Sequence, residues 1–214
     1  MFLKKLLELL FILPTIIIAV IIHEYAHGWA AYKLGDETPK RSGRLTLDPL
    51  KHIDPIGTIL VPILLLITSN FTFTFGWAKP VPVNFLRFRN LRKGLILVSL
   101  AGPLSNLLLA LVFALIYRFL VFPFPAFSSS YLEFFTRYMV IINSVLAIFN
   151  LIPIPPLDGS KILYGIFLKY PQDVLMNPKI DMYGMIILVI LLFFGVIGKI
   201  ISPILTWLIY LLLW

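Results

Sequence analysis

The sequence contains no cysteine. Disulfide bonds and thiolate metal sites are therefore excluded, and any transition metal must be held by histidine, aspartate or glutamate. These residues are also scarce, because the 214 residues include only three histidines and ten acids. The set of candidate metal ligands is correspondingly small.

Charged residues are scarce as well, at 13% of the chain, whereas hydrophobic residues make up 60%. Soluble domains carry about 25% charged residues, so this balance predicts an integral membrane protein. The net charge of +8 does not indicate a nucleic-acid surface, because the basic residues lie between apolar runs and the aromatic residues lie within them. We therefore expect a lipid bilayer, and no nucleic acid, as partner.

Neither an internal repeat nor a Gly/Ser-rich linker divides the chain. We expect residues 1–214 to form a single integral-membrane domain. The basic start at 1–5 and the apolar run after it are interpreted as a retained first span, because no small-residue cleavage site precedes His23.

Charge-free intervals predict the spans, because about 20 apolar residues are needed to cross the hydrocarbon core. The first runs from about 9 to 32 and is interrupted only by one polar motif, while 94–117 and 138–157 contain no charged residue. Near the C-terminus, 182–198 and 200–214 allow one long kinked helix or two short ones. The predicted fold class is an all-α polytopic membrane protein with about five to six hydrophobic segments.

The interval 55–78 is also free of charge, but Pro62 interrupts it and Phe71–Phe75 alternates with period two. It predicts a short helix followed by extended chain. The flanking segments 33–54 and 79–93 are rich in basic residues, which favours the cytoplasm for both. The interval between them is then a re-entrant or extended, β-like element that enters and leaves by one face. The N-terminus is expected outside.

One motif in the first span has the spacing of a metal site. His23-Glu24-Tyr25-Ala26-His27 matches His-Glu-x-x-His, which places two imidazoles on one helical face with the glutamate beside them. Ionisable residues inside a span usually face a partner or a water-filled cavity. Two histidines hydrogen-bonded between helices are the alternative, and the intervening Glu24 favours the metal site.

A catalytic zinc ion normally has three protein ligands and one open position. An extended histidine motif would need histidine at position 33, where the chain has lysine, and His52 lies in a loop rich in turn signals. Apart from Glu24 and Asp158, the acids lie at span ends or in loops: Glu8, Asp36, Glu37, Asp48, Asp54, Glu133, Asp173 and Asp181. Asp158 remains, after a proline-broken segment, 150–157, that leaves backbone groups free at membrane depth.

Topology supports this choice of third ligand. Ligation requires the C-terminal ends of the first span and of 138–157 to lie on the same side of the membrane. The interval 94–117 then runs outward and 79–93 is cytoplasmic, as the charges indicate. We expect a multi-pass protein of the cell membrane with its metal site toward the cytoplasm.

With these two motifs, the sequence resembles the site-2 protease family of intramembrane zinc metalloproteases. His23–His27 resembles the family's His-Glu-x-x-His helix, and Asn150–Gly159 its downstream Asn-x-x-Pro and Leu-Asp-Gly segment. Weaker resemblance, within roughly residues 20–165, lies in Gly102–Asn106, Gly76–Pro82 and Gly43–Pro49. We expect the compact form, without PDZ or CBS modules.

The resemblance implies cleavage of peptide bonds within or near transmembrane segments of a membrane-protein substrate, as in regulated intramembrane proteolysis. One catalytic zinc ion would be held by His23, His27 and Asp158, and Glu24 would take a proton from water. The resemblance also implies that Asn150 binds substrate. Asn106 could stabilise an oxyanion or bond another helix.

Extended chain near the site would help an unwound substrate to bind. The segments 43–50 and 71–83 combine alternation with glycine and proline, and their strand edges could pair with such a substrate.

Two other functions fit parts of the pattern. A membrane metal-ion transporter would need further ligands toward the other face, where the sequence has nothing comparable. A catalytically inactive membrane scaffold would be expected to lose Glu24 or a ligand, and all are present. Another divalent metal stays open, although two histidines and one aspartate suit zinc well.

Overall fold

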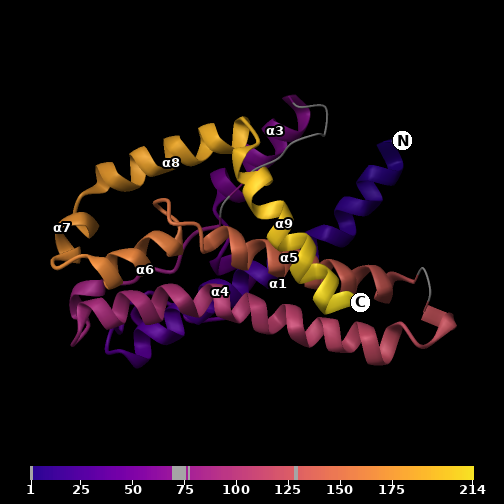
Figure 1. Cartoon of the computed structure of the whole chain (residues 1–214), viewed down its shortest axis with the longest axis horizontal. Coiled ribbons are helices and arrows are strands. Elements are labelled where there is room, and N and C mark those ends of the chain that lie inside the picture. The colour runs from indigo at the N-terminus through magenta and orange to yellow at the C-terminus, as the bar shows by residue number, and fades with distance from the viewer. Residues whose placement is uncertain (1, 69–75, 77, 128–129) are drawn as a thin grey trace.

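The computed structural model describes residues 2–68, 76, 78–127 and 130–214. All regular secondary structure in these residues is helical (Figure 1), which confirms the all-α prediction for this part of the chain. The α-helices are α1 Phe2–Lys33, α2 Thr38–Arg41, α3 Val61–Thr68, α4 Leu91–Ile116, α5 Tyr131–Asn150, α6 Asp158–Phe167, α7 Pro171–Leu175, α8 Pro178–Phe193 and α9 Val196–Leu213. Shorter 3-10 or π-helical turns are η1 Pro49–Lys51, η2 Pro55–Leu60, η3 Phe85–Arg87, η4 Tyr117–Val121 and η5 Pro125–Phe127.

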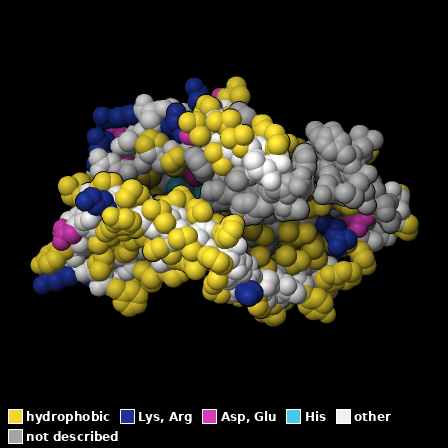
Figure 2. All heavy atoms as spheres, turned by 90° about the horizontal axis from the view of Figure 1, so that it is seen from above, with side chains coloured by type: hydrophobic (Ala, Val, Ile, Leu, Met, Phe, Trp, Pro, Cys, Tyr) yellow, Lys and Arg dark blue, Asp and Glu magenta, His cyan; other side chains and the backbone are white. Residues whose placement is uncertain are grey.

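Within the described residues, four helices are long and apolar enough to cross a membrane: Ile12–Lys33, Leu91–Val121, Tyr131–Asn150 and Val196–Leu213. The surface agrees with a lipid environment. On the face of the molecule drawn in Figure 2, hydrophobic side chains cover most of the described surface, and lysine and arginine gather mainly toward one end. Helix α8 is apolar but has only 16 residues, so it is roughly 24 Å long and shorter than the hydrocarbon core.

Helix α4 is the centre of the packing and contacts α1, α5, α6 and α9 (Figure 1). Ala114 of α4 and Val140 of α5 belong to one buried cluster, and the small residues Ala110 on α4 and Ala147 on α5 are also buried. Small side chains let helix backbones approach closely in membrane proteins. The trio α1, α4 and α5 therefore forms a tight unit.

Two boundaries of α5 differ from the charge-free interval 138–157. The helix begins earlier, where the Ser130 hydroxyl accepts a hydrogen bond from the Glu133 N–H, and an ion pair between Glu133 and Arg137 accommodates charge in its first turns. It ends at Asn150, because the prolines that follow cannot continue a helix.

The expected short helix after residue 55 is present as η2 and α3, with 6 and 8 residues. Their combined length is roughly 20 Å, too short to cross the hydrocarbon core. Phe71–Phe75 lies outside the described residues, so the re-entrant element stays a prediction. The segment 78–84 is neither helix nor strand.

The C-terminal region forms two helices and not one long kinked helix. Helices α8 and α9 are separated at Gly195, whose φ of 69° lies in the left-handed region that ends helices. Leu188 of α8 packs with Ile197 and Ile201 of α9 and with Leu157, which precedes α6. This cluster covers the segment that leads to Asp158.

Candidate active site

Three predicted ligands meet at one point between the helices. His23 and His27 lie one turn apart on α1, and Asp158 is the first residue of α6. The Nε2 atoms of the histidines are 3.0 Å apart, and Asp158 Oδ2 lies 3.1 Å from His27 Nε2 and 3.3 Å from His23 Nε2. All three side chains are buried. They form the one cluster of three such ligand atoms found in the described residues.

The outer nitrogens of the two rings show where the protons are. His27 Nδ1 lies 2.7 Å from the carbonyl oxygen of Val98, which can only accept, so this nitrogen carries a proton. His23 Nδ1 donates in the same way to Asn106 Oδ1 at 2.6 Å. In neutral imidazoles both Nε2 atoms therefore present lone pairs to each other and to the Asp158 carboxylate.

Three acceptors at such short separations repel one another unless a cation lies between them. Ligands at about 2.0–2.1 Å from a tetrahedral zinc ion are roughly 3.3 Å from each other, close to the separations found here. The donor set of two imidazoles and one carboxylate, with each imidazole held by an outer partner, is also typical of catalytic zinc sites. The residues present therefore fit a zinc ion.

Asn106 connects the metal group to α5. Its Nδ2 donates to the Ala19 carbonyl at 3.1 Å and to Asn143 Oδ1 at 2.7 Å, which leaves Oδ1 to accept from His23. Asn143 in turn donates to the Met139 carbonyl of its own helix. Both asparagines have no exposed surface. The chain of bonds runs from α5 through α4 to α1 and sets the orientation of the His23 ring.

Gly102 on α4 lies directly against the two imidazoles. A Cβ atom at this position would overlap the Nε2 atoms of both His23 and His27. The absence of a side chain here leaves the space in which the ligand atoms converge.

The segment 151–157 places Asp158. It follows α5 as a chain of turns, with the Ile154 N–H bonded to the Ile152 carbonyl and the Leu157 N–H to the Ile154 carbonyl. Gly159 packs closely on Leu151, and a Cβ atom at position 159 would overlap the carbonyl oxygen of Leu151. Asp158 lies in the first turn of α6, where the helix dipole stabilises a carboxylate.

Glu24 points into the same cavity and is held by a neighbouring segment. Its Oε2 accepts a hydrogen bond of 2.7 Å from the Val81 N–H. The buried Arg44 donates to the carbonyls of Lys51, Lys79 and Pro80, which fixes the chain just before Val81. One carboxylate oxygen of Glu24 is therefore positioned by backbone.

The cavity beside the ligands has a volume of about 680 Å³. His23, Glu24, His27 and Asp158 line it together with Asn150. Asn150 Nδ2 donates to the Leu146 carbonyl at 2.9 Å and keeps a second N–H. The volume lies within the range of ligand-binding cavities.

The structure brings together His23, Glu24, His27, Asp158 and Asn150 at this cavity, and it places Asn106 behind His23. His52 lies apart from them, buried, with Nε2 bonded to the Thr46 carbonyl. Sequence reasoning missed Asn143 and the Val98 carbonyl. Asn143 carried the same signal as Asn150, an amide inside a charge-free interval, whereas a backbone carbonyl carries none.

Comparison with known proteins places the chain in a family. It is 40% identical to “Putative zinc metalloprotease YwhC” of Bacillus subtilis over 185 aligned residues. The aligned region covers 85% of this chain and 79% of YwhC. The model for peptidase family M50 matches residues 125–195, from η5 to Gly195 between α8 and α9. The chain belongs to peptidase family M50, the site-2 proteases.

A less similar relative is Rip2 of Mycolicibacterium smegmatis, which carries the same description as YwhC. It is 30% identical over 176 residues, which cover 82% of this chain and 64% of Rip2. The MJ0611 protein of Methanocaldococcus jannaschii, described in the same words, is 42% identical over 66 residues, 31% of each chain. No solved structure matches the chain significantly.

Family and structure together establish a multi-pass membrane metalloprotease. The M50 match includes the segment 151–157 and Asp158, while His23 and His27 lie outside it. The geometry of the three ligand atoms is thus an observation separate from the family match.

Proposed function

We propose that this protein is an intramembrane zinc protease that cleaves peptide bonds within or near transmembrane segments of other membrane proteins. The observation that carries the proposal is the convergence of His23, His27 and Asp158, with Glu24 in the same cavity, among helices apolar enough to span a membrane. Regulated intramembrane proteolysis is the process in which such an activity would serve.

When bound, a zinc ion lowers the pKa of water to about 7 and polarises the scissile carbonyl. His23, His27 and Asp158 would hold it. Glu24 would take a proton from the attacking water and deliver it to the leaving amine. The Val81 N–H holds Oε2 of Glu24, so Oε1 is the oxygen assigned to this transfer.

The two asparagines have different proposed roles. Asn150 has an N–H left for the cavity and would donate to the carbonyl oxygen as negative charge develops there. Asn106 has both of its N–H groups and its acceptor engaged by Ala19, Asn143 and His23. We therefore assign Asn106 to holding His23 rather than to contacting substrate.

A transmembrane substrate must unwind before its peptide bonds can be attacked, because a helix bonds all its amides internally. Apolar residues such as Val20, Phe149 and Leu188 line much of the cavity and suit a hydrophobic segment. The segment 78–84, which is neither helix nor strand, lines the same cavity and is the proposed edge to which an unwound substrate adds.

The proposed orientation in the cell membrane has the N-terminus outside and the metal site toward the cytoplasm. It rests on the basic residues in 33–54 and 79–93. The short combined length of η2 and α3 supports a 55–78 element that enters and leaves by one face.

Glu24→Gln tests the proposal against the rival functions. It keeps an acceptor for the Val81 N–H but cannot take a proton, so cleavage of a co-reconstituted single-span substrate should fall about a thousandfold while zinc content is unchanged. His23→Ala is the matched control and should lose both zinc and cleavage. Full cleavage by Glu24→Gln would refute the mechanism. Zinc transport by wild-type protein that cleaves none of the substrates would favour the transporter.

A further inference from the structure

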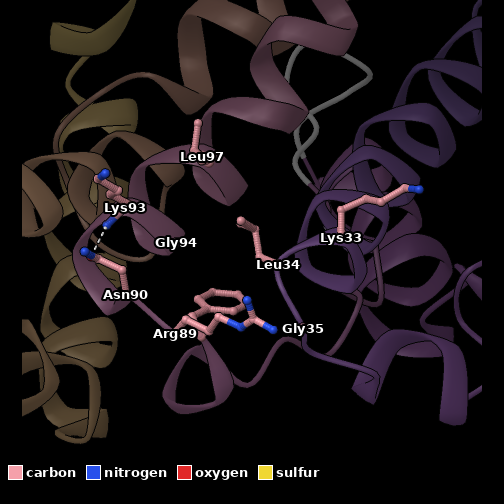
Figure 3. A pocket seen from close by; sticks show the side chains of 9 residues that line it. Lys33, Leu34, Gly35, Arg89, Asn90, Lys93, Gly94 and Leu97 are labelled. Atoms are coloured by element: carbon pink, nitrogen blue, oxygen red, sulfur yellow. Dashed lines mark hydrogen bonds between the residues drawn. The ribbon is translucent and has the colours of Figure 1, made fainter.

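A second cavity, of about 390 Å³, lies between the end of α1 and the start of α4. Figure 3 shows its lining, with Lys33 and Leu34 on the α1 side and Arg89, Lys93 and Leu97 on the α4 side. It shares no lining residue with the cavity at the metal ligands. Neither the proposed proteolysis nor the metal site explains it.

The lining is strongly cationic. Lys33, Arg89 and Lys93 contribute three positive charges, and no acidic residue is present. All three side chains are exposed, and none forms an ion pair with a described carboxylate. The ammonium of Lys33 lies over the Trp29 ring, 5.6 Å from its centroid, and its side chain is directed away from Arg89 and Lys93 in Figure 3. Because the lining contains no carboxylate, the positive charges of Arg89 and Lys93 favour an anion in the cavity.

The floor of the cavity is apolar. The buried Phe88 ring lies on Gly94, where a Cβ would overlap it, and Leu34 and Leu97 form adjoining walls. The lining therefore has a basic part and an apolar part. A ligand with a negatively charged group and a hydrophobic part would match both, whereas a small ion would match only the basic part.

The cavity also lies at the ends of two candidate membrane spans. Lys33 is the last residue of one candidate membrane span, and Leu91, which follows the lining residue Asn90, is the first residue of another. The ends of both spans meet the boundary between hydrocarbon and water, where the phosphates of phospholipids lie.

We propose that this cavity binds the headgroup phosphate of an anionic phospholipid such as phosphatidylglycerol. Arg89 and Lys93 would contact the phosphate, with Arg89 able to bond two of its oxygens. The glycerol and first acyl carbons would lie against Leu34, Phe88 and Leu97. The volume is within the usual range for ligand sites. The inference does not depend on the proposed proteolysis.

The test is equilibrium binding of fluorescent phosphatidylglycerol to the purified full chain in a neutral detergent. The double variant Arg89→Gln with Lys93→Gln should weaken binding about thirtyfold, as expected for two lost cation–phosphate contacts. The control is Lys51→Gln with Lys169→Gln, which removes two exposed charges that lie elsewhere and should change binding less than threefold. Arg89→Lys with Lys93→Arg keeps the charges and should also retain binding.

Four results would overturn the proposal. Fluorescent phosphatidylcholine could bind as tightly as phosphatidylglycerol, which would leave no role for the anionic headgroup. The control pair could weaken binding as much as the Arg89 and Lys93 pair, which would indicate general attraction by net charge. Inorganic phosphate could displace the lipid at equal concentration, which would make the site one for free phosphate. Loss of binding in the charge-retaining variant would likewise contradict it.

Discussion

At the scale of single residues, the orientation of His23 depends on a neighbour that is not itself one of the proposed metal ligands. Asn143 has no exposed surface and reaches His23 only through Asn106. Outer partners of metal-binding histidines fix the ring and its protonation. Asn143 is therefore a positioning residue.

Asn143→Ala is expected to weaken zinc affinity by about tenfold to a hundredfold, because Asn106 loses the acceptor that holds it and His23 loses a fixed partner. Competition with a zinc chelator measures this effect directly. Ser144→Ala is the matched control, since Ser144 is equally buried and its hydroxyl has no hydrogen-bond partner among the described residues. Equal zinc affinity in the two variants would contradict the role of Asn143.

Residue chemistry made much of the candidate site predictable. His23, Glu24 and His27 follow from spacing on one helix, and Asp158 follows by elimination because the chain has so few ligands. The bond between Asn106 and Asn143 depends on how two helices are rotated against each other. That rotation is a tertiary property, and no local pattern in the sequence encodes it.

At the scale of elements, irregular segments position the chemistry that the helices surround. The segment 151–157 delivers Asp158, and 78–84 supplies the N–H that holds Glu24. The sequence marked both through their prolines. It did not mark the early start of α5. Glu133 and Arg137 form an ion pair inside the helix, whereas a search for charge-free intervals ends the span at these two residues.

The proposed substrate edge can be tested with Val83→Pro. The substitution removes one backbone donor from 78–84, so cleavage of a transmembrane substrate should fall roughly fivefold to tenfold with zinc content unchanged. Val83 is preferable to Val81, whose N–H already bonds Glu24. Val83→Ala controls for the lost side chain. Unchanged cleavage by the proline variant would argue against strand addition here.

At the scale of the whole molecule, the contacts of α1 define the relative directions of the core helices. His23 on α1 contacts Asn106 on α4, and His27, one turn further along α1, contacts Val98, which lies about two turns before Asn106 on α4. Helices α1 and α4 are therefore antiparallel. Helix α5 follows α4 in the chain and packs along it, so the ends of α1 and α5 lie on one side, as the proposed ligation by Asp158 requires.

The absence of cysteine makes the orientation directly measurable. Single substitutions Lys51→Cys and Phe124→Cys introduce one thiol each, at exposed positions in η1 and before η5. In intact cells a membrane-impermeant maleimide should label Phe124→Cys alone, and Lys51→Cys only after lysis. The unmodified chain is the control and should remain unlabelled. Labelling of both variants in intact cells would show that the two segments share the outer face.

Gly102 shows that the needs of a helix and of a site can conflict. Glycine inside a helix is less favourable than alanine by roughly 0.5–1 kcal/mol, because it has more conformational freedom to lose. Alanine would improve α4 taken alone, yet its methyl group would occupy the space where the ligand atoms of α1 converge. The chain therefore keeps a weaker helix former where α4 lies against the two histidines of α1, and local stability is given up there for the geometry of the site.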